Sequence, residues 1–320
     1  MNRRALCRNA IVVSLASRTW ASLEAKAPVW SFVTGDDQLR ILRNDKPIAT
    51  FVTRHPKTRR PFFHDIFTPG GMRITRPIPP DPQSEDTDHD TMHPGLWLAF
   101  GDLNGVDYWR NKAEVRHVRY SKPVNVDNDS LSFEVENHWL DVDGTAANCR
   151  EFARYRFSSI GPDAVLDWSS KFMTDRPAIR LGHQEEMGLG IRLTRPLTVK
   201  KGMGRIDCSN GGVDEKGTWG RDASWWAASV PSRVDGNPGN SFRKGVQILA
   251  ECDPGDRPFW GHTRDYGLIV ANPSSRPGSG VDSISIPASM PMEFRFRIRL
   301  FDTADPGLDA WAADHPIRNA

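Results

Sequence analysis

Much of the chain consists of short segments in which apolar and polar residues alternate. The clearest runs from Phe294 to Leu300, where apolar residues occupy every second position and arginines lie between them. Successive side chains of a β-strand point to opposite faces, so this pattern predicts a strand with one buried face. Four further segments have the same character and are bounded by turn-forming residues: Leu131 to Trp139, Phe152 to Phe157, Ala164 to Phe172 and Gly245 to Ala250.

Helical patterns are scarce. Only the segment from Pro306 to His315, near the C-terminus, predicts a helix, and it is short. Many short strands without intervening helices predict an all-β fold, and the length of 320 residues favours a large antiparallel β-sandwich. Because all-β units often exceed about 200 residues, we expect residues 28–320 to form one domain.

A long loop leads into one unusual strand. Leu96 to Phe100 is apolar on both faces, which predicts a central strand with polar groups at the rims of the sandwich. The preceding segment, Thr68 to Pro94, is rich in proline and contains an acidic stretch. Loops of this length are usually functional or disordered. We expect it to carry functional groups over a cleft, although a solvated insertion is an equally weighted alternative.

Composition and charge exclude some functions. The chain has 11 Trp and 15 Phe, enough aromatic surface for a large core. Its formal net charge is only +2 and the basic residues are scattered, so nothing predicts binding to nucleic acid. No segment has the roughly 18 consecutive apolar residues of a membrane-spanning helix. The mature protein is therefore expected to lack an integral membrane segment.

The N-terminus resembles an export signal. Three arginines precede an apolar run from Ala10 to Ala16, and small residues follow up to Ala27. We expect residues 1–27 to direct the protein to the periplasm or the cell exterior, and the pair Arg3 and Arg4 would suit the twin-arginine route. The alternative is the N-terminus of a cytosolic protein, without a targeting function.

The cysteines give no sign of a metal site. Cys7 would leave with the signal, so Cys149, Cys208 and Cys252 would allow at most one disulfide. No CxxC spacing exists, which argues against structural zinc.

Candidate chemistry gathers in four polar blocks. In the block of residues 183–190, Glu185 and Glu186 are adjacent. Neighbouring side chains of an extended segment point to opposite faces, so only one of these two carboxylates can enter a given cleft. Tryptophans in these blocks could stack on sugar rings, although for any single tryptophan a core position is favoured. The blocks are residues 88–109, 183–190, 215–226 and 260–267.

These blocks, with one shorter motif, resemble a bacterial family usually labelled PmoA-like. The resemblance covers roughly Pro61 to Pro273, with the blocks in the expected order, and it is specific at the family level. The matching motifs are Arg-Pro-Phe-Phe-His ending at His64, the block from Asp88 to Trp109, Glu-Glu-Met-Gly-Leu-Gly from Glu185, Gly-Thr-Trp-Gly around Trp219, and His-Thr-Arg-Asp-Tyr-Gly-Leu from His262 with Ala-Asn-Pro ending at Pro273.

The resemblance implies a β-sandwich similar to that of galactose mutarotases, whose cleft combines histidines with a carboxylate. Members of this family are commonly labelled methane oxygenase. That activity is not implied here, because the membrane subunit of a methane mono-oxygenase needs membrane-spanning helices and this sequence predicts none. The segment from Asp88 to His93 reads Asp-His-Asp-Thr-Met-His and differs from the Asp-His-Pro-His-His form of many members. A metal triad is therefore not carried over.

Our first hypothesis is an exported carbohydrate-active enzyme, a hydrolase, lyase or epimerase that acts on a glycoside or an oxidised sugar. His93 and His262 would be the acid and base, because imidazole titrates near neutral pH, and Glu185 would be the complementary carboxylate. The expected substrate-binding residues are His64, Arg264, Trp97, Trp109, Trp219 and Asp107.

Two alternatives remain open. One is a metal-dependent enzyme that holds a divalent ion with some of His64, His89, His93 and His262, although no local metal-binding motif supports it. The other is a non-catalytic sugar-binding module, for which exposed tryptophans would suffice. Convergence of His, Glu and Arg in one place would favour an enzyme.

Overall fold

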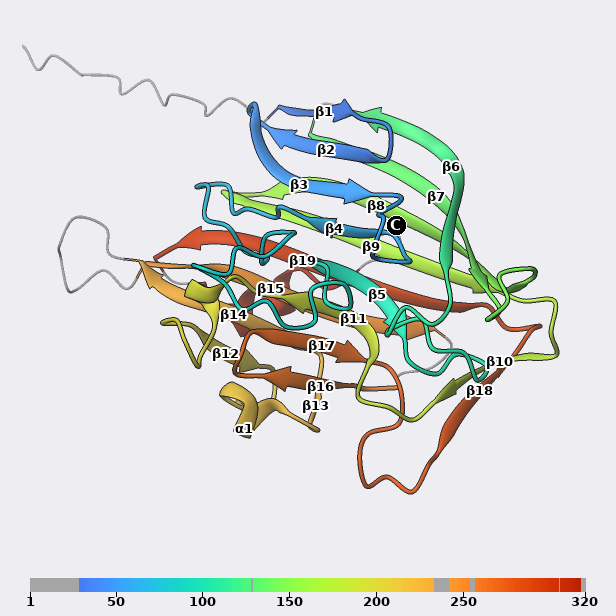
Figure 1. Ribbon diagram of the computed structural model, residues 1–320. Helices are drawn as coiled ribbons and strands as arrows, with labels where there is room; N and C mark the ends of the chain where they lie inside the picture. Colours follow the sequence, from blue (N-terminus) through green and yellow to red (C-terminus); the bar gives the residue numbers. More distant parts are fainter. Residues whose placement is uncertain (1–28, 128, 233–241, 254–256, 305, 318–320) are drawn as a thin grey trace, which may run out of the picture.

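The computed structural model describes residues 29–127, 129–232, 242–253, 257–304 and 306–317. Two large antiparallel sheets face each other, as Figure 1 shows. The expected all-β antiparallel sandwich with a short C-terminal helix is confirmed. The expected export signal lies outside the described residues.

The first sheet has nine strands in the order β1-β2-β3-β4-β5-β11-β17-β16-β13. The apolar strand β5 lies inside this sheet, between β4 and β11, as its two apolar faces predicted. The bounds are β1 Trp30–Thr34, β2 Gln38–Arg43, β3 Lys46–Val52, β4 Phe62–His64, β5 Leu96–Phe100, β11 Met187–Arg192, β17 Leu268–Asn272, β16 Phe259–Arg264 and β13 Asp222–Ala223.

The second sheet has eight strands in the order β12-β14-β15-β19-β9-β8-β7-β6. The five alternating segments of the sequence all lie within its strands β7, β8, β9, β15 and β19. The bounds are β12 Arg205–Cys208, β14 Trp225–Ser232, β15 Phe242–Asp253, β19 Met292–Thr303, β9 Asp163–Met173, β8 Ala147–Ile160, β7 Ser130–Leu140 and β6 Val115–Val126.

The remaining elements are small. Strands β10 (Ala178–Gly182) and β18 (Ser283–Pro287) form a separate two-stranded sheet, and a 3-10 turn spans Arg195–Leu197. Helix α1 covers Asp214–Thr218 and helix α2 covers Leu308–Asp314. None of the described helices is long and apolar enough to span a membrane.

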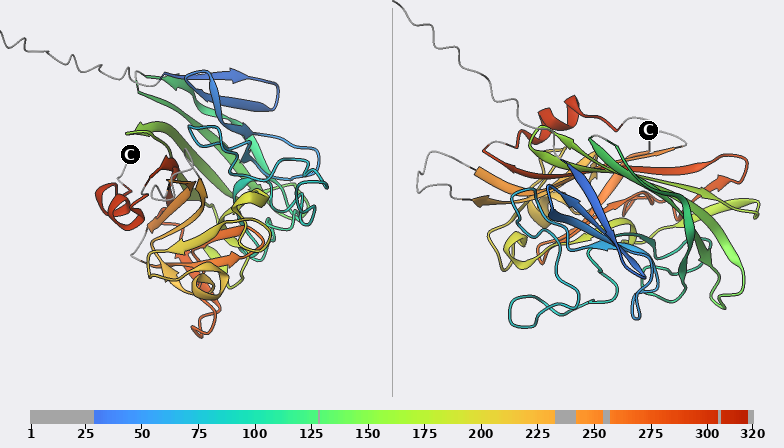
Figure 2. Two further views of the ribbon diagram at one scale, coloured as in Figure 1. Left: turned by 90° about the vertical axis from the view of Figure 1, so that its left-hand side faces the viewer. Right: turned by 90° about the horizontal axis from the view of Figure 1, so that it is seen from above.

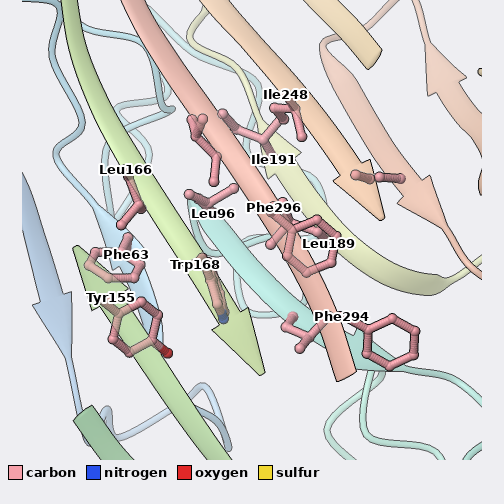
Figure 3. Close-up of a cluster of buried hydrophobic side chains, with 14 of the residues drawn as sticks. Phe63, Leu96, Tyr155, Leu166, Trp168, Leu189, Ile191, Ile248, Phe294 and Phe296 are labelled. Carbon is pink, nitrogen blue, oxygen red and sulfur yellow. The ribbon is translucent and has the colours of Figure 1, made fainter. Parts of the chain in front are cut away.

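The core lies between the two sheets. Phe63 of the nine-stranded sheet packs against Tyr155 and Trp168 of the eight-stranded sheet, with ring centroids 5.0 and 5.7 Å apart (Figure 3). Burial of such aromatic side chains is the main favourable contribution to stability. Helix α2, at the red end of the chain, lies on the opposite face of the eight-stranded sheet (Figure 2). There Trp311 belongs to a buried cluster with Trp225.

Candidate functional site

The candidate site lies on the outward face of the nine-stranded sheet. Along β5, Leu96, Leu98 and Phe100 enter the core, whereas Trp97 and Ala99 pack in a separate cluster on the other face. The pairing of β5, β11, β17 and β16 sets Trp97, Gly190, Val270 and His262 in one row across this face. At about 4.8 Å per strand, Trp97 and His262 are roughly 14 Å apart along the sheet.

His262 lies at one end of this row and is the titratable group around which the neighbouring charged side chains gather. Its Nδ1 lies 2.8 Å from the backbone oxygen of Glu185 and 3.7 Å from that residue's carboxylate. A carbonyl oxygen can only accept, so Nδ1 carries the proton and Nε2 remains the basic nitrogen. Burial lowers the pKa of His262, whose side chain is 5% exposed. The ring is therefore neutral at pH 7 and can act as a base.

The turn that carries Glu185 is held in place by a second side chain. Asn272 donates through Nδ2 to the backbone oxygens of Gln184 and Glu185, at 2.9 and 3.0 Å. Asn272 lies at the end of β17, on the strand next to His262. The imidazole and its partner carbonyl are thus fixed by two neighbouring strands.

Arg264 joins two carboxylates beside His262. Its Nη2 lies 2.7 Å from Glu185 and its Nη1 lies 3.4 Å from Glu215. The guanidinium also lies over the ring of Trp219, 5.6 Å from the centroid. Glu215 is held in turn by the backbone N–H of Asp265, at 3.0 Å. His262, Glu185, Arg264, Glu215 and Trp219 form what we call the His262 cluster.

The second histidine belongs to an aromatic stack at the other end of the row. The ring of His93 lies between His89 and Trp97, with centroids 5.0 and 5.3 Å away. Trp97 in turn contacts Trp109 at 5.1 Å. Exposure of His93, Trp97 and Trp109 is only 5%, 0% and 1%, so these two indoles offer no open stacking surface in this structure. Burial lowers the pKa of His93 well below its usual value.

His64 and Asp107 form their ion pairs with residues outside the His262 cluster. His64, on the outward face of β4, borders a cavity of about 360 Å³ with His55, and its Nδ1 lies 3.6 Å from Asp65. Asp107 pairs with Arg110 at 3.1 Å. They therefore contribute to the surroundings of the face and not to the His262 cluster itself.

The two adjacent glutamates diverge. Glu185 pairs with Arg264, whereas Glu186 pairs with Arg110 at 2.6 Å. The acidic turn therefore contributes one carboxylate to each of two different groups of charges, and only Glu185 belongs to the His262 cluster.

The structure thus brings together four of the expected site residues, namely His262, Glu185, Arg264 and Trp219. His93, Trp97 and Trp109 form a second group on the same face. Among the described residues, no group of three or more His, Cys, Asp or Glu side chains is arranged to hold a metal ion. The set of His64, His89, His93 and His262 therefore does not fit a metal site in this part of the chain.

The sequence interpretation missed two arginines on this face, Arg76 and Arg192. Their side chains are 2% and 1% exposed, and both reach the carboxylate of Asp88. One signal was available, because Arg192 is in phase with Gly188 and Gly190 along β11. A residue in phase with two glycines points to the same face of the strand as they do.

The sequence matches a described family. A family model, DUF6807, described as a family of unknown function, matches residues 38–311. The chain belongs to this family. The match does not decide whether the PmoA-like resemblance is right, so that label remains a prediction. No curated protein matches the sequence significantly.

Several solved structures align with most of this chain at very low sequence identity. A GH36 α-galactosidase from Geobacillus stearothermophilus is 8% identical, with a TM-score of 0.39 over 86% of this chain, which spans only 41% of that protein's length. A galactose mutarotase-related enzyme from Lactobacillus acidophilus is 10% identical, with a TM-score of 0.34 over 86% of this chain and 98% of its own. An aldose epimerase homologue from C. elegans is 7% identical, with a TM-score of 0.34 over 87% of this chain and 100% of its own. These scores carry no argument about activity.

Proposed function

We propose that this protein is a carbohydrate-active enzyme that transfers protons on a sugar, with His262 as the base. The observation that supports it is the hydrogen bond from His262 Nδ1 to the Glu185 backbone oxygen, which leaves Nε2 as the basic nitrogen, while the Glu185 carboxylate lies 3.7 Å from Nδ1. A neutral imidazole at pH 7 suits abstraction of a proton from a hydroxyl group or from an activated ring carbon.

The His262 cluster also offers the contacts that sugars use. Trp219 is partly exposed and offers an indole face, while Glu185 and Glu215 offer hydrogen-bond acceptors on either side of Arg264. A few converging polar groups beside an aromatic side chain are typical of small-ligand sites.

Among the reactions considered, the cluster favours epimerisation or elimination over hydrolysis. A glycoside hydrolase commonly needs one protonated and one ionised carboxyl group flanking the bond. Here both carboxylates are ion-paired with the same guanidinium, and the neutral base is an imidazole. The base would take a proton from the sugar. In epimerisation a proton from water is then added to the opposite face of the same carbon. In elimination the electrons of the broken C–H bond form the double bond, and the leaving group departs with its bonding electrons.

The decisive experiment combines a substrate screen with one matched pair of variants. Reducing sugars and uronic acid glycosides would be incubated with the protein in D₂O and followed by ¹H NMR for anomer exchange, deuterium incorporation and alkene signals. His262→Asn keeps an N–H near the position of Nδ1 but removes Nε2, and His138→Asn on β7 is the control. We expect His262→Asn to lower kcat by about 10²- to 10⁴-fold, and His138→Asn to leave it unchanged.

Two results would contradict the proposal. One is a His262→Asn protein with full activity on a substrate that the wild type converts. The other is a sugar that binds at Trp219 without any proton exchange or elimination, which would favour a binding module instead. A melting temperature for each variant would separate loss of chemistry from loss of fold.

We also propose that the protein acts outside the cytoplasm, on the basis of its N-terminal sequence alone. Fractionation of cells that express the full chain, compared with a variant in which Arg3 and Arg4 are replaced by Gln, would test this.

A further inference from the structure

Two arginines face each other on the outward face of the nine-stranded sheet. An antiparallel bridge pairs Thr75 with Leu193, and the Arg76 backbone N–H donates to the Arg192 oxygen at 3.0 Å. This pairing sets Arg76 opposite Arg192, so that both side chains lie on the same side. Like charges at such positions normally destabilise a sheet.

One carboxylate lies between the two guanidinium groups. Asp88 Oδ1 is 2.8 Å from Arg192 Nη2 and 3.5 Å from Arg76 Nη1. Asp88 belongs to the long loop before β5, and its side chain is 41% exposed although those of both arginines are buried. The anion therefore comes from a surface loop, whereas the cations are fixed in the sheet.

This carboxylate uses only some of the donors that the two arginines offer. Arg192 Nε and Nη1 and Arg76 Nη2 are buried and have no hydrogen-bond partner among the described residues. Arg192 is further held over the ring of Tyr266, 4.4 Å from its centroid. A buried donor without a partner is costly, and native proteins retain few of them except at sites with another role.

Two other acidic side chains of the same loop, Glu85 and Asp86, bind other partners. Glu85 accepts from the Thr194 hydroxyl and from the backbone N–H of Arg195. Asp86 pairs with Lys201. Among the described side chains, Asp88 is thus the one carboxylate that forms a salt bridge with either arginine.

We infer that Arg76 and Arg192 form a binding site for the carboxylate of an acidic sugar, and that Asp88 occupies this site until the sugar displaces it. A planar carboxylate can accept two parallel hydrogen bonds from a guanidinium, which would use donors that Asp88 leaves free. The inference rests on the proposed function, because it names a substrate class for the same face.

The position suits a substrate that also reaches the His262 cluster. Arg192 pairs with Leu268, and Leu268 pairs with Arg264 on the next strand. Arg192 and Arg264 are therefore two strand spacings apart, roughly 10 Å. A uronic acid residue at Arg192 would place an adjoining part of the substrate near His262.

Three variants test the inference through binding alone. Asp88→Asn removes the competing carboxylate, Arg192→Gln removes the main donor, and Arg119→Gln on β6 is the control. The ligands for calorimetry are methyl glucuronide and methyl glucoside, with sodium acetate as a carboxylate without a sugar, all at one ionic strength.

We expect the wild type to bind the glucuronide at least about tenfold more tightly than either the glucoside or acetate, because a buried charge pair dominates the affinity. Arg192→Gln should lose about tenfold or more of this affinity, Asp88→Asn should gain affinity, and Arg119→Gln should behave as the wild type. A gain in Asp88→Asn is the distinctive sign, because a merely structural Asp88 would weaken binding when it is removed.

The inference is overturned by equal affinity for the glucuronide and the glucoside, or by weaker glucuronide binding in Asp88→Asn protein with an unchanged melting temperature. Acetate binding as tight as the glucuronide would also overturn it, since the sugar would then play no part. Its failure is distinguishable from that of the proposed function. Turnover of a neutral sugar that depends on His262 would uphold the function without the anion site.

Discussion

Two buried charged groups illustrate the difference between the core and the outward face. Glu151 lies between the sheets, where its carboxyl group accepts from Asn137 and Trp139 at 3.1 and 3.0 Å and from Ser170 at 2.5 Å. Arg192 lies on the outward face, and two of its nitrogens have no partner among the described residues. Burial is similar at the two sites, but the extent of hydrogen bonding is not.

This difference separates a structural polar group from a candidate binding group. A polar group within a core must be satisfied by the protein itself, because nothing else reaches it. A group below a surface loop can instead be completed by a ligand when the loop moves. The hydrogen bonds to Glu151 therefore contribute to stability, whereas the unsatisfied donors beneath the Asp88 loop become available to a ligand when that loop moves.

The largest expected loss of stability follows from a substitution in the core, at Glu151. Glu151→Leu would leave the donors of Asn137 and Trp139 unpaired, and we expect it to lower the free energy of unfolding by about 3 kcal/mol. Glu151→Gln keeps an acceptor and should cost much less. Chemical denaturation of both variants measures the difference, and equal stabilities would show that the network is not important.

A smaller loss of stability is expected at Gly190, where the outward face is tightly packed. A Cβ atom on Gly190 would lie 2.5 Å from the ring of Trp97 and 3.0 Å from that of Trp109. Gly190→Ala should therefore destabilise the protein by about 2 kcal/mol and shift the indole fluorescence. Gly105→Ala is a control in which the added Cβ meets nothing within 4 Å, although its φ of +83° adds some strain. A fluorescence shift in the control, or none in Gly190→Ala, would contradict the expected packing.

The smallest expected effect is a pH dependence at His93. Its folded-state pKa is lowered by burial, so the unfolded chain binds the proton more readily. Stability due to this group is complete above the unfolded pKa and is lost as pH falls below it. The loss at pH 6 is at most about 0.8 kcal/mol, if the unfolded pKa is about 6.5.

His93→Phe should remove this acid sensitivity while keeping an aromatic ring next to Trp97. Thermal unfolding between pH 5 and pH 8 would show a shallower profile for the variant than for the wild type. Parallel profiles would mean that the pKa of His93 is the same in the folded and the unfolded protein.

Much of the fold could be predicted because its signals are local. Strict alternation identified the strand that contains Phe294 to Leu300, and apolarity on both faces identified β5 as central. The helix predicted over Pro306 to His315 is α2, Leu308–Asp314. Each of these features depends on the spacing of neighbouring residues.

The site was only partly predictable because it depends on contacts that are distant in sequence. The blocks containing Glu185, Trp219 and Arg264 could be identified, but their meeting around one guanidinium could not. Asp88 and Arg192 are 104 positions apart, and nothing in either segment indicates the other. A core position was favoured for any single tryptophan, but the sequence did not show what covers Trp97 in β5 or Trp109 in the turn after it, because the covering segments are not set by the neighbouring residues.

The place of β19 in the eight-stranded sheet has a consequence for how the chain acquires its fold. β19 lies between β9 and β15, so that Arg299 bonds to Asp163, 136 positions earlier. During synthesis, β9 therefore keeps one unpaired edge until β19, Met292–Thr303, has emerged. Sheets closed by such distant pairings fold slowly, and open strand edges invite aggregation. Dilute refolding, or help from a chaperone, should raise the yield of native protein more than any single change in the site.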